Sequence, residues 1–215
     1  MQRLLDKGLE ELTVMVFKMG KLAEQALSKS ISGYLEGRDV SKDIHELSEA
    51  LGNRSVEVEE KTFSLITKYQ PVASDLRIIN SYVKIAYDFY RYGRYAWDIA
   101  FVNSRFNDKT KQCDKWINDY VAKMAQRVME MVGVSINSVK TLDPELVKNL
   151  SAAEDDVDND YLMYLSKLVE VQTVANECTI SSLLVVRYLE RIADHAMHIM
   201  EAVVYIATGE KLNLM

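Results

Sequence analysis

Cysteine, proline and glycine are all scarce in this sequence, and each scarcity argues against a class of structure. Only two cysteines occur in 215 residues, Cys113 and Cys178, and they lie far apart and outside any CxxC pattern. Neither a disulfide framework nor a thiolate metal site is indicated, so we expect two packed thiols in a reducing cytosol. Two prolines and eight glycines leave few interruptions of regular structure, which favours long helices.

Long apolar runs and concentrated positive charge are also missing. No stretch approaches the roughly 18 apolar residues that a membrane-spanning helix needs. The N-terminal segment MQRLLDKGLEELTVM carries acids within its apolar rhythm, unlike a signal peptide. The formal net charge is −6, and lysine and arginine are dispersed, which argues against nucleic acid and fits a cation or a basic protein surface better. We expect a soluble protein without a transmembrane segment.

Apolar residues recur at spacings of three and four through almost the whole chain, which is the period of an amphipathic helix. Predicted helix ends lie at Gly37, before Pro71, between residues 103 and 108, before Pro144 and at Gly209. The pattern therefore predicts six helices, most of them about thirty residues long, and no strands.

The six predicted helices form two similar groups of three. DFYRYGRYA at 88–96 and YLERIADHA at 188–196 share arginine at the fourth position and alanine at the ninth. Self-similarity at a period of about one hundred residues indicates a duplicated unit. The predicted fold is all-α, with two tandem antiparallel three-helix bundles, the first comprising residues 1–106 and the second residues 107–215.

Two pairs of acids in the second repeat are spaced to share a helix face. Glu190 and Asp194 are four residues apart, as are Glu154 and Asp158, so the members of each pair lie one turn apart on one side of a helix. We expect Glu190 and Asp194 on the polar side of their helix or at its edge. Glu154 and Asp158 share an arc with apolar residues, where carboxylates are costly unless a cation pairs with them or a metal ion binds.

If the two helices are antiparallel neighbours, these four carboxylates meet. Oxygen ligands at that density suit magnesium, manganese, calcium or iron, can also hold zinc, and can bridge several ions. His198 lies on the stripe of Glu190 and is a candidate additional ligand, whereas His195 points roughly 140° away around the helix, which favours a surface or supporting position. Arg187 and Arg191 are the alternative source of positive charge.

The first repeat has lost most of these acids. The positions that match Glu154, Asp158, Glu190 and Asp194 are Ser55, Glu59, Tyr90 and Arg94. We expect a degenerate site there, with an ion pair between Glu59 and Arg94 that Tyr90 partly covers. The two repeats would then neutralise their acids with different cations.

Five segments together form a recognisable pattern. They are QPVASDLR at 70–77, DFYRYGRYA at 88–96, EDDVDNDY at 154–161, RYLERIADHA at 187–196 and VVYIATGE at 203–210. They resemble the PhoU family of phosphate-uptake regulators, and the resemblance covers essentially the whole chain. It implies multinuclear clusters of iron, zinc, manganese or magnesium on ExxxD or DxxxD motifs, with the ligand role falling to Glu154, Asp158, Glu190 and Asp194. Ser55, Tyr90 and Arg94 depart from the family's ligand pattern.

The resemblance also implies a regulatory function. Such proteins are thought to act at the cytoplasmic, ATPase side of the high-affinity phosphate ABC transporter and, in many bacteria, to connect it to a phosphate-sensing histidine kinase. We therefore expect a cytoplasmic, metal-binding adaptor that restrains phosphate uptake and reaches the membrane through its partners. Tyr87, Tyr90 and Trp97 lie outside or at the edge of the apolar arc of their helix, which favours a docking surface or a homodimer, or a cover from a neighbouring bundle.

Two other functions remain alternatives. The chain could be a helical scaffold without metal, or a regulator of another transporter, with Arg187 and Arg191 neutralising the acids. It could instead be a carboxylate-bridged metalloenzyme. The four-helix di-iron pattern requires Glu-x-x-His, which is absent at Glu154 and Glu190, and no catalytic triad or phosphate-binding loop is recognisable. We expect no enzymatic activity.

Overall fold

The computed structural model describes residues 3–110, 113–170 and 176–212. Within these ranges the chain forms six α-helices and no strand, which confirms the predicted all-α fold. The helices are α1 (Leu4–Glu36), α2 (Ser41–Tyr69), α3 (Ala73–Thr110), α4 (Lys115–Thr141), α5 (Leu146–Glu170) and α6 (Glu177–Thr208). None of the helices in the described ranges is long and apolar enough to span a membrane.

The helices end close to most of the predicted positions. Gly37 closes α1 in the left-handed conformation, with φ of 63°, which glycine adopts without steric cost. The predicted break between residues 103 and 108 is wrong, because α3 continues to Thr110. A polar residue is needed at position 103 for tertiary packing rather than to end the helix. The buried amide nitrogen of Asn103 donates hydrogen bonds to the carbonyl oxygens of Gly33 and Arg38, at 3.3 and 2.6 Å.

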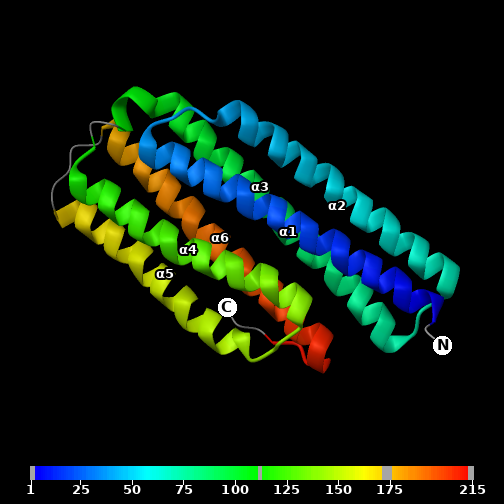
Figure 1. The fold of residues 1–215 in the computed structure, drawn as a ribbon. Helices are drawn as coiled ribbons and strands as arrows, with labels where there is room; N and C mark the ends of the chain where they lie inside the picture. The colour runs from blue at the N-terminus through cyan, green and yellow to red at the C-terminus, as the bar shows by residue number, and fades with distance from the viewer. Residues whose placement is uncertain (1–2, 111–112, 171–175, 213–215) are drawn as a thin grey trace.

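The helices are arranged as two antiparallel three-helix bundles packed side by side (Figure 1). Helices α3 and α6 form the centre and contact each other extensively, and α1 contacts α4 across the same boundary. Helices α2 and α5 lie at opposite edges and, in the part of the chain that the structure describes, contact only helices of their own bundle. Helix α6 is consequently covered by neighbours on almost every side.

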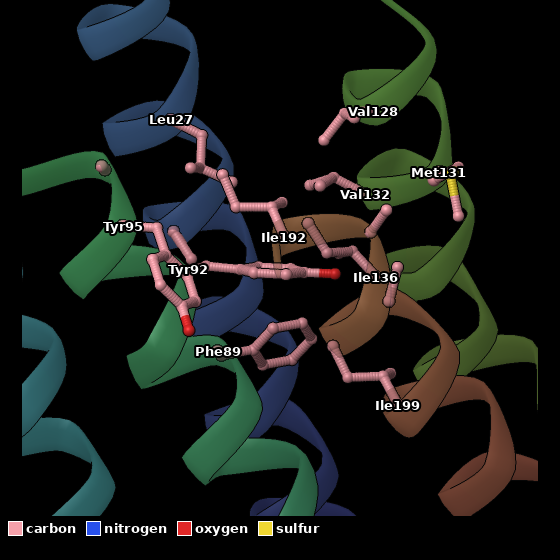
Figure 2. Packing of buried hydrophobic residues seen from close by; sticks show 14 of the residues in the cluster. Leu27, Phe89, Tyr92, Tyr95, Val128, Met131, Val132, Ile136, Ile192 and Ile199 are labelled. Carbon is pink, nitrogen blue, oxygen red and sulfur yellow. The ribbon is translucent and has the colours of Figure 1, made fainter. Parts of the chain in front are cut away.

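One apolar core runs through both bundles. Figure 2 shows Phe89 and Tyr92 of α3 packed towards Ile136 of α4 and towards Ile192 and Ile199 of α6. The Tyr92 hydroxyl also lies 3.1 Å from the hydroxyl of Ser135 on α4. The two bundles therefore share one apolar core.

The two cysteines correct one expectation. Cys113, just before α4, and Cys178, in the first turn of α6, form a disulfide, with Cα atoms 5.5 Å apart. The expectation of two separate thiols is therefore wrong. The cysteines are 65 residues apart in the sequence, so nothing in the sequence indicated that they meet. They are close because α4 and α6 begin at the same end of the molecule (Figure 1).

The shared core predicts the effect of truncating Phe89. Replacing this fully buried ring with alanine leaves a cavity between the bundles, so Phe89→Ala is expected to lower the free energy of unfolding by about 3–5 kcal/mol. The matched control is Phe63→Ala, which removes the same atoms from a side chain that is 72% exposed and should change stability by no more than about 0.5 kcal/mol. Urea denaturation measures both values, and equal losses in the two variants would contradict a shared core.

Candidate metal site

Helices α5 and α6 bring together the four acids that the sequence singled out. The two helices run antiparallel (Figure 1), which aligns Glu154 and Asp158 of α5 with Glu190 and Asp194 of α6. One carboxylate oxygen each from Glu154, Asp158 and Asp194 lies within 4.8 Å of the others. Glu190 adjoins them one turn before Asp194, and its charge acts on Glu154. We call these four residues the four-acid cluster.

The burial of these acids differs from the expected burial. Glu190 and Asp194 were expected at the polar side of α6, but they are only 9% and 4% exposed. Glu154 is buried as expected, whereas Asp158 is exposed. The reason lies in the layout: α6 is the central helix of its bundle and has little solvent-facing side, while α5 is an outer helix.

Two arginines of α6 neutralise half of the cluster. Arg187 Nη1 pairs with Glu190 Oε1, and Arg191 Nη1 lies 2.7 Å from Asp194 Oδ2. In each pair the arginine and the acid lie one helical turn apart, and both arginine side chains are partly exposed to solvent. The second carboxylate oxygen of Glu190 is nevertheless buried without a hydrogen-bond partner. An unsatisfied buried oxygen is costly, so this atom is available to a further cation.

In the described part of the chain, the two cluster acids of α5 have no such partner. Within the described residues, no ion pair involves Glu154 or Asp158. Burial raises the pKa of Glu154 to about 7, and the nearby charges of Asp158 and Asp155 add to the effect. Burial and the charge of Asp194 raise the pKa of Asp158 as well. Carboxylates whose ionisation is opposed by desolvation and by neighbouring acids are groups that a bound divalent cation would stabilise.

A neighbouring acid of α5 has a different role. Asp160 is buried, and its carboxylate lies 3.0 Å from Arg127 Nη1 of α4. Arg127 also reaches Asp156 at 3.4 Å. This ion pair fastens α5 to α4. Sequence reasoning missed it because the spacing of acids on α5 carries no information about which side of that helix faces α4.

Among its described residues, the first repeat has neither a matching acid cluster nor the ion pair expected in its place. Ser55 is buried and Glu59 is exposed, while Tyr90 and Arg94 are half-buried. In the parts of the chain that the structure describes, no ion pair joins Glu59 to Arg94. The charge of Arg94 acts instead on the carboxyl of Asp98, one turn further along α3. Burial raises the pKa of Asp98, and the guanidinium of Arg94 lowers it in part.

The physical reason for this error is that Glu59 faces another part of the molecule. Together with Asp88 and His198 it lines a surface hollow. Tyr90 packs instead beside Gly52 of α2, where an added Cβ atom would meet its ring at 3.4 Å. The matched positions of the two repeats are therefore equivalent in sequence but not in surroundings.

The histidines of α6 belong to a different group of side chains. His195 was expected at the surface or in a supporting position, yet it is only 5% exposed, and its Nδ1 atom lies 2.8 Å from Asp88 Oδ1 of α3. The surface alternative is wrong because α3 covers that side of α6. His198, the candidate additional ligand, lies with its Nδ1 atom 3.7 Å from the same oxygen, and it groups with Asp88 and His195, apart from the four-acid cluster.

The raised pKa of Glu154 predicts a pH-dependent stability for metal-free protein. In the unfolded chain this carboxyl ionises near its ordinary value of 4.5, whereas in the folded chain it ionises near 7. Folding therefore retains a proton between these values, so the contribution of Glu154 to stability is present at low pH and is lost as pH rises towards 7. Glu154→Gln, which keeps the side chain neutral, should raise the thermal midpoint at pH 8 and change it little at pH 4.

Thermal denaturation in the presence of a chelator measures this difference. The control is Glu57→Gln, which makes the same change on the exposed face of α2 and should leave the pH profile unaltered. A Glu154→Gln variant less stable than the wild type at pH 8 would show that the carboxylate is already compensated.

The sequence and the fold were compared with known proteins. The PhoU domain family model matches residues 16–102 and again residues 121–203, and the predicted boundary near Asn107 falls between the two matches. A PhoU homolog of Clostridium acetobutylicum is 30% identical over 220 residues, covering 99% of this chain and 98% of the relative. A PhoU homolog of Synechocystis is 29% identical over 210 residues, covering 96% and 92%. Both relatives are named phosphate-specific transport system accessory proteins.

Solved structures show the same fold. The crystal structure of PhoU from Pseudomonas aeruginosa superposes with a TM-score of 0.87 at 22% identity, covering 95% of this chain and 99% of that one. The regulatory protein PhoU from Streptococcus pneumoniae gives a TM-score of 0.76 at 20% identity, covering 97% and 99%. With the domain matched twice along the sequence and the bundle arrangement shared, this chain belongs to the PhoU family.

Proposed function

We propose that this protein is a regulatory accessory component of a phosphate transport system and that it binds divalent metal ions at the four-acid cluster. Its relatives are named as accessory proteins of such a system, which supports a regulatory rather than a catalytic function. The observation that carries the metal proposal is the imbalance of charge between α5 and α6, where four carboxylates face two guanidinium groups.

The donor set of the cluster fits iron, manganese, magnesium or zinc. Carboxylate oxygens can each bind one ion or bridge two, which supports a multinuclear site. Glu154 and Asp158 would contribute from α5, and the oxygen atoms of Glu190 and Asp194 that the arginines leave free would contribute from α6. A bound metal would supply the positive charge that the cluster lacks, and it would fasten the outer helix α5 to the central helix α6.

We propose that the protein is a cytoplasmic homodimer. Its proposed partners are the ATPase side of a phosphate ABC transporter and a sensor histidine kinase. Exposed apolar side chains support docking to other proteins. Val56 and Phe63, seven residues apart on α2, are 53% and 72% exposed, so they share the outer face of an edge helix. Tyr87 of α3 is 53% exposed, whereas Trp97 packs its ring against His45 and Phe101, which makes it a poorer docking residue.

Metal content tests the cluster directly. Protein purified without a tag or chelator should retain bound iron, zinc, manganese or magnesium, and a Glu190→Ala, Asp194→Ala double variant should lose it. The control is the Glu46→Ala, Glu49→Ala double variant, which removes the same charge from exposed positions of α2. Elemental analysis by mass spectrometry measures the result. Folded wild type without metal would favour the scaffold in which Arg187 and Arg191 alone neutralise the acids.

Phosphate uptake tests the regulatory function. Deleting the gene should raise the rate of phosphate uptake in phosphate-replete medium, because the restraint on the transporter is removed. The wild-type gene should restore the lower rate, and so should the gene with the control substitutions Glu46→Ala and Glu49→Ala. Radiolabelled phosphate uptake measures the rate, and an unchanged rate in the deletion strain would count against this function. The gene with the Glu190→Ala, Asp194→Ala substitutions should fail to restore the lower rate if the bound metal is needed for regulation, and should restore it if the metal is not needed.

A further inference from the structure

A second group of metal-binding side chains lies where the two bundles meet, at the contact of α3 and α6. Asp88 comes from α3, and His195 and His198 come from successive turns of α6. One candidate ligand atom from each of the three side chains lies within 4.8 Å of the others. Asp88 and His195 are buried, and His198 is half-buried.

The simplest alternative is a buried hydrogen bond between His195 and Asp88. That hydrogen bond explains one imidazole, with 2.8 Å between Nδ1 and Oδ1. It does not explain why the second imidazole approaches the same carboxylate oxygen, with its Nδ1 atom at 3.7 Å. A carboxylate and two imidazoles that converge in this way are donors that a single cation can bind.

The chemistry and spacing of the three side chains suit a transition metal. Two imidazoles and one carboxylate are the donor set of zinc and of ferrous iron. Ligand atoms about 2.1 Å from an ion lie roughly 3.0 Å apart at right angles and roughly 3.4 Å apart in a tetrahedron. The distances from Asp88 Oδ1 to the two Nδ1 atoms, 2.8 and 3.7 Å, lie on either side of these values.

Solvent reaches this group through a surface hollow. The hollow has a volume of about 530 Å³, and Asp88 and His198 are among its lining residues. Glu59, Lys84, Glu201 and Lys211 also line it, so the hollow is polar and charges of both signs flank the group. An ion held by Asp88 and His198 would thus have open positions for water and a route of entry.

We propose that Asp88, His195 and His198 form a mononuclear site for Zn²⁺ or a closely similar divalent cation. The site is separate from the four-acid cluster and uses nitrogen ligands that the cluster lacks. Because Asp88 belongs to the first repeat and both histidines to the second, an ion bound here ties the two bundles together at the α3 and α6 contact.

X-ray absorption of the zinc-loaded, untagged full-length protein distinguishes the two sites, since imidazole gives a characteristic scattering signal. The wild type should show two imidazoles on one bound zinc. His198→Gln should show one, and its zinc affinity should fall by at least about tenfold. Asp88→Asn keeps the size and hydrogen-bonding capacity of the side chain, and it should also lower the affinity. His45→Gln changes the third histidine of the chain, which is exposed on α2, and should leave both the signal and the affinity unchanged.

Three results would overturn the proposal. Oxygen-only coordination in the wild type would show that zinc binds only at the carboxylates. Equal zinc affinity in the wild type and His198→Gln, with both folded by circular dichroism, would show that the histidine is not a ligand. Loss of the imidazole signal in the Glu190→Ala, Asp194→Ala variant would show one joint site. Retention of that signal supports two separate sites, whatever the metal content of the cluster.

Discussion

The packing of α3 against α6 is the constraint on which the rest of this structure depends. Each of these helices is the centre of its own bundle, and their contact joins the two bundles over a common core. Phe89 and Tyr92 supply large apolar surfaces at this boundary (Figure 2). Because α6 is surrounded by α3, α4 and α5, its buried polar residues must be satisfied inside the protein rather than by water.

The acids of α6 and their neighbours show how this requirement is met. Glu190 and Asp194 use arginines of the same helix, and Asp160 uses Arg127 of α4. Asp88 uses the histidines of α6. Among the residues that the structure describes, Glu154 and Asp158 form no ion pair with a cationic side chain, and desolvation raises the pKa of each. The charge that is left over lies between α5 and α6, and this local deficit is the physical basis of the proposed metal binding.

The duplicated architecture places unequal chemistry at equivalent positions. The second repeat keeps four acids, whereas the first has serine, tyrosine and arginine at three of the matching positions. A metal at the four-acid cluster would fasten an outer helix to a central one, while a metal at Asp88, His195 and His198 would fasten the two central helices.

The sequence by itself determined the six helices, the duplication and which acids of α5 and of α6 share a helix face, because three- and four-residue spacing is a local property of a helix. It did not determine the burial of Glu190 and His195, the orientation of Glu59, the helical continuation past Asn103 or the disulfide of Cys113 with Cys178. Each of those depends on which helix lies opposite, and helical periodicity specifies a face but not its neighbour. Only the tertiary structure, by placing α6 at the centre, decided which polar residues are buried and which partners they meet.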